Sequence, residues 1–242
     1  MKKLPTIDAM YWAMIVSATT IGETGGDLIS TSLGLGYGWG TLVLLSLFVL
    51  ACAVEVSFPR RHIALYWLVI MLASTAGTTV SDYLSRTLHL GYALDTGLLA
   101  AMLAGVFLLL KRLDRRTEGS LFGEFSRATE ALYWLAILTS STLGTAFGDL
   151  IANGTRLGFA GGTVLLAALL VVIAALERFT RTPKQLCYWL AIVVTHPIGA
   201  TMGDYLTKPE GLGLGNVTAT AVLVAIFAAI SGLAFARRPV SG

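Results

Sequence analysis

The chain has few charged residues and almost no cysteine. Only 13% of its 242 residues are Asp, Glu, Lys or Arg, while 55% are hydrophobic and the mean hydropathy is +0.76. A soluble domain of this length cannot hide so much apolar surface, so the composition indicates an integral membrane protein. Cys52 and Cys187 show no CxxC or Cys/His spacing, so neither a disulfide framework nor a thiolate metal site is indicated.

Enzyme signatures are also missing. The sequence contains no Walker loop, no nucleophile elbow, no HExxH and no defensible Ser/His/Asp arrangement. We therefore expect that the protein is not an enzyme and carries no covalently bound cofactor. Its net charge of +3 follows from membrane topology, as shown next, and gives no argument for a nucleic-acid partner.

Long apolar runs recur along the whole chain. Each is about 17 to 25 residues long, enough to cross a hydrocarbon layer as a helix. We count eight, at residues 9–31, 40–58, 63–86, 95–111, 128–152, 161–177, 185–206 and 216–236. The first run resembles a signal peptide in following Lys2 and Lys3, but it contains Glu23 and Asp27 and lacks a small-residue cleavage site, so we expect a retained helix.

Basic residues are concentrated on one side of the predicted membrane. With eight spans, 14 of the 17 Lys and Arg fall at the termini or in the loops after the second, fourth and sixth spans. The other side has only Arg86, Arg156 and Lys208. This bias predicts that both termini are cytoplasmic and that the lipid bilayer surrounds the chain.

A sequence motif occurs four times. Tyr-Trp pairs at 11–12, 66–67, 133–134 and 188–189 are each followed, sixteen residues after the Tyr, by an aspartate in GETGGD, GTTVSD, GTAFGD or GATMGD. These aspartates are Asp27, Asp82, Asp149 and Asp204. A Leu-Gly pair and a Thr follow each aspartate at fixed distances, so the chain consists of four repeats.

The repeats are grouped into two similar halves. The first and third aspartates are 122 residues apart, as are the second and fourth. We divide the chain into a first half at 1–110, a charged cytoplasmic connector at 111–130 and a second half at 131–242. The predicted fold is an all-α polytopic membrane protein, with eight transmembrane helices from four parallel two-helix repeats, pseudo-symmetric about an axis along the membrane normal. This differs from the inverted repeats of many transporters.

Parallel motif helices place the four aspartates at one depth. Sixteen residues correspond to roughly 24 Å along a helix, so a Tyr-Trp pair in the cytoplasmic aromatic belt would put the carboxylates in the outer part of the membrane. We expect the four tryptophans to anchor the protein at that belt. Intramembrane carboxylates are costly and usually face a bundle interior, so the aspartates should form a ring.

Residues seven, four and three positions before each aspartate should share its helix face. They are Thr20, Glu23 and Thr24; Thr75, Thr78 and Thr79; Thr142, Thr145 and Ala146; and Pro197, Ala200 and Thr201. This stripe of hydroxyl and carboxylate oxygens suits a hard cation such as Mn²⁺, Mg²⁺ or Ca²⁺. Glu23 has no acidic counterpart and the fourth repeat carries His196 instead, so the site is expected to be asymmetric.

Structural roles would also explain parts of the motif. A small-xxx-small glycine pattern in each repeat would let helices approach closely. Alternatively, glycine would break the helix and free carbonyl ligands. Each Asp would have a structural role if it capped the next helix or bonded a Thr such as Thr41. Glu55 and Glu177 are expected to form surface ion pairs, and Asp95 to cap the fourth span.

The fourfold Gly-x-Thr-x-Gly-Asp pattern resembles the bacterial membrane proteins built from the "repeat of unknown function", also described as uncharacterised membrane-anchored proteins. The resemblance covers nearly the whole chain and implies an eight-helix inner-membrane protein. GETGGD is also similar to the Glu-x-Gly-Asp motif of manganese and calcium exporters of the cation/proton exchanger type. Here, however, the acids are one residue further apart, the following basic residue is missing and the repeats are parallel.

These observations predict an exporter of a divalent cation, with Mn²⁺ first, in which the four aspartates and Glu23 bind the ion. Crowded carboxylates bind protons readily, so an exchange of the metal for protons is a further expectation. Thr20, Thr24, Thr75, Thr78, Thr79, Thr142, Thr145, Thr201 and His196 would support the site. The alternatives are a pathway for organic cations or protons, and a membrane anchor or regulator that transports nothing. A monomer and a homodimer are both compatible with the repeats.

Overall fold

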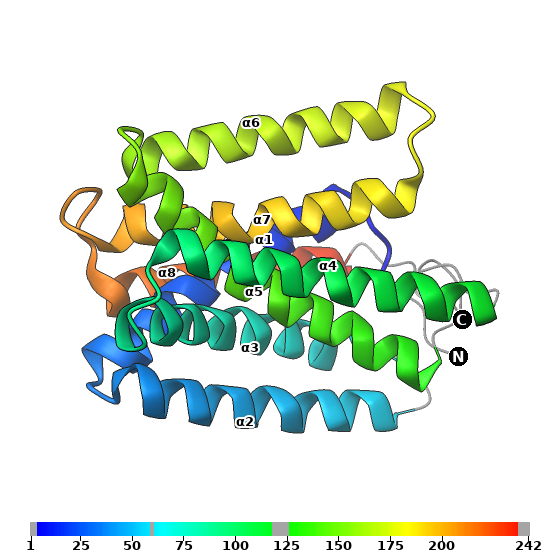
Figure 1. Cartoon of the computed structure of the whole chain (residues 1–242), viewed down its shortest axis with the longest axis horizontal. Helices are drawn as coiled ribbons and strands as arrows, with labels where there is room; N and C mark the ends of the chain where they lie inside the picture. The colour runs from blue at the N-terminus through cyan, green and yellow to red at the C-terminus, as the bar shows by residue number, and fades with distance from the viewer. Residues whose placement is uncertain (1–3, 59–60, 118–125, 237–242) are drawn as a thin grey trace.

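The computed structural model describes residues 4–58, 61–117 and 126–236, and within them all regular structure is helical (Figure 1). The helices are α1 (Ala9–Asp27), α2 (Gly36–Ser57), α3 (Ile63–Asp82), α4 (Tyr92–Thr117), α5 (Arg127–Gly154), α6 (Gly158–Phe179), α7 (Lys184–Thr207) and α8 (Gly215–Ala236). Two π-helical segments, η1 (Leu28–Ser32) and η2 (Tyr83–Thr87), extend α1 and α3. The predicted all-α fold with eight helices is confirmed.

Seven of the described helices are long and apolar enough to cross a membrane, and α1 is the exception. Its second half is rich in Thr and Gly and contains Glu23, because it packs among α3, α7 and α8 and not against lipid. The predicted connector at 111–130 is partly helical, since α4 ends at Thr117 and α5 begins at Arg127. Residues 118–125 of the connector lie outside the described residues, as do Lys2, Lys3, Arg60, Arg237 and Arg238.

The four motif helices form a closed inner ring. Helix α1 packs against α3 and α7, and α5 packs against the same two helices. The second helix of each repeat packs on the first helix of the next repeat, α2 on α3, α4 on α5 and α6 on α7, and α8 closes the circle by packing on α1. Figure 1 shows that α1 begins and α8 ends at the same end of the bundle. We call this the basic end, and the opposite end, where the motif helices finish, the acidic end.

Each turn at the acidic end depends on the repeated Leu-Gly pair. Gly36, Gly91, Gly158 and Gly213 all have positive φ angles, between 62° and 73°. Side chains other than glycine rarely adopt this backbone region, so glycine lets the chain reverse direction within a few residues.

Glycines also set the spacing of the inner ring. A Cβ on Gly22, Gly77, Gly144 or Gly199 would overlap the residue that faces it on the neighbouring motif helix, which is Ser74, Ser141, His196 or Thr19 respectively. In every repeat, therefore, the glycine five residues before the aspartate touches the residue that lies eight positions before the aspartate of the neighbouring repeat. Helix α1 continues without a break through its glycines, so the interpretation that glycine frees carbonyl ligands is wrong there, while the close-packing interpretation agrees with these contacts.

The repeated tyrosines close the axis near the basic end. The hydroxyl of Tyr11 is 2.9 Å from that of Tyr66 and 3.0 Å from that of Tyr188, and Tyr133 completes the cycle at 2.9 Å from both. We call these four residues the tyrosine ring. All four are buried, and each hydroxyl can donate one hydrogen bond and accept another around the cycle.

Four isoleucines lie one turn beyond the tyrosine ring, toward the acidic end. They occupy the last position of YWAMI, YWLVI, YWLAI and YWLAI, and are Ile15, Ile70, Ile137 and Ile192. Each is at most 1% exposed, and all belong to the same hydrophobic cluster. The basic end of the axis is thus closed by a hydrogen-bonded layer followed by an apolar layer.

The tryptophans do not form a belt at the membrane surface. Trp67, Trp134 and Trp189 are buried, and Trp12 is partly buried. Each packs on the tyrosine of the preceding repeat, with ring centroids 5.5 Å apart for Tyr11 and Trp67 and 6.0 Å apart for Tyr188 and Trp12. The prediction of surface anchors is wrong because these rings fill the spaces between adjacent motif helices.

Replacing Gly22 by Ala should destabilise the protein, because α1 and α3 must separate to make room for the methyl group. Overpacking of this kind costs about 1–3 kcal/mol. The matched control is Gly105→Ala in α4, where a Cβ would have open space around it. Thermal unfolding of both variants in detergent measures the effect. Equal melting temperatures would contradict the proposed role of the close approach.

Replacing Tyr66 by Phe should also lower stability, because it removes two hydrogen bonds of the ring and leaves two buried hydroxyls each short of a partner. At roughly 0.5–1.5 kcal/mol per bond, the expected loss is about 1–3 kcal/mol. Tyr205→Phe, at a partly buried tyrosine outside the ring, is the control. If both changes have the same effect in a denaturation experiment, the ring does not stabilise the bundle.

Candidate functional site

The four repeated aspartates lie together near the acidic end of the inner ring. Asp27 and Asp82 are the last residues of α1 and α3, directly before the π-helical segments, and π-helical turns are frequent at functional sites. Asp149 lies five residues before the end of α5, and Asp204 lies in the last turn of α7. Asp27 is partly buried, and the other three aspartates are buried.

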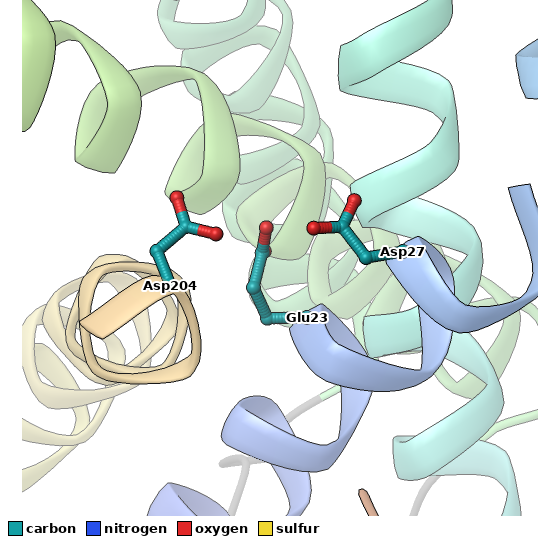
Figure 2. A group of neighbouring side chains, drawn as sticks. All are labelled: Glu23, Asp27 and Asp204. Atoms are coloured by element: carbon teal, nitrogen blue, oxygen red, sulfur yellow. The ribbon is translucent and has the colours of Figure 1, made fainter. Parts of the chain in front are cut away.

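Three carboxylates converge on one point. One oxygen from each of Glu23, Asp27 and Asp204 lies within 4.8 Å of the others. Figure 2 shows these carboxylates turned toward one another, with Glu23 between the two aspartates. Oδ1 of Asp204 is buried and has no hydrogen-bond partner within the described residues. We call these three residues the carboxylate group.

Glu23 reaches from α1 across the axis. Its Oε2 accepts hydrogen bonds from the hydroxyls of Thr78 on α3 and Thr145 on α5, both at 3.0 Å. Glu23, Thr78 and Thr145 are equivalent positions of their repeats, and the fourth is Ala200, whose small side chain cannot form such a bond. The axis at this level therefore carries one acid held by two hydroxyls. The close packing of Glu23 on Gly203 fixes it against α7.

Two basic side chains accompany the aspartates, and the sequence analysis missed their role. Nε of Arg86 is 2.6 Å from Oδ1 of Asp82, and Nζ of Lys208 is 2.6 Å from Oδ2 of Asp204. Each base follows its aspartate by four residues, so the helical spacing alone could have predicted both pairs. These are two of the three basic residues assigned to the less basic side of the membrane.

The remaining aspartates are linked through one of these bases or by an amide. Arg86 also lies 3.6 Å from Asp149, with its Nη2 facing Oδ2. Asn153, four residues after Asp149, donates to Oδ1 of that aspartate at 3.2 Å. The predicted ring of four equivalent acids is therefore two unlike pairs, Asp27 with Asp204 beside Glu23, and Asp82 with Asp149 bridged by Arg86.

The threonines of the predicted stripe differ in the hydrogen bonds that their hydroxyls form. Thr20, Thr75 and Thr142 donate to carbonyls four residues earlier in their own helices, which leaves their oxygens as acceptors. Thr24 and Thr201 accept hydrogen bonds from Thr220 of α8 and Thr163 of α6, at 2.9 Å and 2.8 Å, and Thr201 also donates to the carbonyl of Pro197 four residues earlier. The hydroxyl of Thr79 donates to the carbonyl of Ala76 in its own helix. Of the four positions three before an aspartate, Thr24 and Thr201 thus contact the outer helices, whereas Thr79 bonds within its own helix.

His196 lies away from the carboxylates. Its Nδ1 is 2.8 Å from the carbonyl oxygen of Ile192, and its Cβ packs against Gly144 at the contact between α5 and α7. Nε2 is buried without a hydrogen-bond partner in the described part of the chain. His196 precedes Asp204 by two helical turns and does not belong to the carboxylate group.

Glu55 forms no surface ion pair. It is fully buried, 3.5 Å from Arg61, which lies at the same distance from the buried Glu130. The guanidinium of Arg61 lies over the Tyr66 ring, 5.1 Å from its centroid. The prediction for Glu55 is wrong because its carboxylate lies inside the bundle, beside the buried side chain of Arg61. Glu177 is exposed.

Two expectations about individual acids, the capping of α4 by Asp95 and a bond between Thr41 and Asp27, are not met. Asp95 lies within the first turn of α4 and not before it, and accepts a hydrogen bond from Ser81 at 3.4 Å, so the capping prediction is wrong. The hydroxyl of Thr41 has no hydrogen-bond partner among the described residues, so it does not hold Asp27.

Thr78→Val should destabilise the protein because it removes a donor to the Glu23 carboxylate while keeping the shape of the side chain. Hydrogen bonds to charged groups contribute about 1.5–3 kcal/mol. Thr75→Val, one turn earlier on the same helix, removes only a bond within that helix and should cost less. Unfolding of both variants in detergent compares them, and an equal loss would argue against a held carboxylate.

Comparison with known proteins agrees with the repeat structure. The family model described as "Repeat of Unknown Function (DUF347)" matches residues 10–60, 65–116, 132–182 and 187–239. Searches of the curated proteins and of the solved structures gave no match. The four matches cover most of the chain, each beginning one residue before a Tyr-Trp pair and including one two-helix unit. The chain is a multi-pass helical membrane protein that belongs to the DUF347 family of repeats of unknown function.

Proposed function

We propose that this protein transports a divalent metal cation along the axis of its inner ring, and that Glu23, Asp27 and Asp204 bind the ion. The observation that carries the proposal is the convergence of these three carboxylates, two of them buried, from two helices. Acidic side chains at membrane depth are energetically costly unless they are paired with another group or bind a ligand. One carboxylate oxygen of Asp204 has no hydrogen-bond partner in the described structure.

The charge of the site favours a cation. Glu23 lies close enough to interact electrostatically with all four repeated aspartates, which gives five carboxylates in one region. Arg86 and Lys208 provide two positive charges, so three negative charges remain without a fixed counter-charge when all five acids are ionised. A divalent cation would neutralise most of this excess.

The donor atoms favour a hard ion. Carboxylate and hydroxyl oxygens surround the site, the two cysteines lie elsewhere, and His196 is outside the carboxylate group. Such oxygen ligands suit Mn²⁺, Mg²⁺ and Ca²⁺ better than Cu⁺ or Zn²⁺. Mn²⁺ is the first ion to test. An enzymatic activity is not part of the proposal, because no nucleophile with an adjacent base accompanies the carboxylates in the described site.

The route of the ion is closed at one end. The isoleucines and the tyrosine ring lie 12 and 16 residues before the aspartates, roughly 18 and 24 Å along the helices. The carboxylate group can therefore exchange ions only with the acidic end in this conformation, and transport requires the two closed layers to separate. By the distribution of basic residues we assign the basic end to the cytoplasm of a bacterial inner membrane, and the direction to export.

Asp27→Asn should weaken Mn²⁺ binding by tenfold or more, a change of about 1.4 kcal/mol, because it removes one of three charged ligands. Purified protein in detergent is titrated with Mn²⁺, Mg²⁺, Ca²⁺ and Zn²⁺ while the melting temperature is recorded, since a ligand of the folded state raises it in a saturable way. The control is Asp95→Asn, at a buried acid of α4 outside the carboxylate group.

The same two variants are then compared in liposomes for Mn²⁺ flux, with and without a pH gradient to test exchange for protons. Wild type and Asp95→Asn should transport, and Asp27→Asn should not. Saturable binding by the wild type without flux would favour a regulator. If no metal changes the melting temperature of the wild type, the proposal is wrong and organic cations become the next ligands to test.

A further inference from the structure

The two halves of the chain provide two equivalent half-sites. A shift of 122 residues converts Glu23 into Thr145, Asp27 into Asp149, Asp82 into Asp204 and Arg86 into Lys208. The first half-site is therefore Glu23, Asp27, Asp204 and Lys208, between α1 and α7. The second half-site is Thr145, Asp149, Asp82 and Arg86, between α5 and α3. Their contacts can be compared atom by atom.

In the second half-site the base bridges both acids. Arg86 lies 2.6 Å from Asp82 on its own helix and 3.6 Å from Asp149 on α5. Its guanidinium also lies 5.8 Å from the centroid of the Tyr37 ring of α2. A planar guanidinium with five donors is well suited to link two carboxylates in this way. Arg86 thus occupies the space between the two aspartates.

In the first half-site the base pairs with one acid. The ammonium of Lys208 lies 2.6 Å from Oδ2 of Asp204, while Oδ1 of the same aspartate has no hydrogen-bond partner among the described residues. Glu23 stands where the second half-site has Thr145, and adds a third carboxylate.

The two substitutions change the charge of the half-sites in a defined way. Counted by these contacts, three carboxylates and one ammonium give the first half-site a formal charge of −2, which one divalent cation balances. Two carboxylates and one guanidinium give the second half-site a charge of −1 and an occupied centre.

We propose that Arg86 is a built-in cation that fills the second half-site, so that the chain binds one divalent ion, in the first half-site, and not two. The inference rests on the proposed function. It makes Arg86 a positioning residue that ties α3 to α5 permanently, while α1 and α7 are joined by the exchangeable ion. Loading and release would then act on the contact between α1 and α7.

The direct test converts the second half-site into a copy of the first. The double variant Arg86→Lys/Thr145→Glu carries the same four residue types in both halves. Full-length wild type and variant are purified in detergent, equilibrated with Mn²⁺, freed of unbound metal and analysed for metal per chain by mass spectrometry. We expect about one ion per wild-type chain and about two per variant chain.

The outcomes distinguish this inference from the proposed function. If the wild type binds no metal, the proposed function fails. If the wild type binds one ion and the folded variant also binds only one, or if the wild type already binds two, Arg86 does not fill a second site and the inference is overturned.

A second comparison does not depend on the double variant folding. In the absence of metal, Arg86→Met removes a link between two helices, whereas Lys208→Met removes a pair within one helix. Arg86→Met should therefore lower the melting temperature further, by at least about 2 °C. An equal or smaller fall for Arg86→Met would overturn the bridging role.

Discussion

The close approach of the four motif helices is the constraint on which the other features depend. A glycine in each helix meets a side chain of the next helix at the same position of its repeat, so the spacing is equal around the ring. Equal spacing brings four tyrosine hydroxyls within hydrogen-bond distance of one another and buries four isoleucines one turn beyond. The same spacing lets Glu23 reach two opposing threonines. In a wider ring, the carboxylates of neighbouring helices would lie too far apart to form one site.

Symmetry in the backbone and asymmetry in the side chains have different consequences. The ring, the turns and the packing of outer helices repeat four times, which accounts for a compact bundle from one short unit. The basic residues beside the aspartates follow only a twofold pattern, since Arg86 and Lys208 occur in the second and fourth repeats, where the first and third have Thr31 and Asn153. Glu23 occurs once. Each departure from the repeat therefore marks a place where the site is specialised, and together they lead to the carboxylate group between α1 and α7.

Much of the fold could be predicted from the sequence because four repeats show four times which type of residue occupies each position. The helices, the shared side of the termini and the burial of the aspartates followed from apolar runs and from the fixed spacing of Tyr-Trp and Asp. The pairing of each outer helix with the following repeat could not be predicted, since hydropathy does not show which neighbour a helix covers. The buried tryptophans were missed for the same reason, because an aromatic pair near a helix start is equally compatible with a lipid interface and with a helix contact. The isoleucine layer and the bases after Asp82 and Asp204 were visible as regular spacings in the printed sequence.

The central claim is that a divalent ion binds between α1 and α7, and locating a bound Mn²⁺ ion tests it most directly. Crystals of the full chain grown with Mn²⁺ would give an anomalous difference map at a wavelength where manganese scatters anomalously. The account predicts one peak, in contact with carboxylate oxygens of Glu23, Asp27 and Asp204, with Arg86 still between Asp82 and Asp149. A map with no peak at these carboxylates, or with the peak between Asp82 and Asp149 and Arg86 displaced, would contradict it.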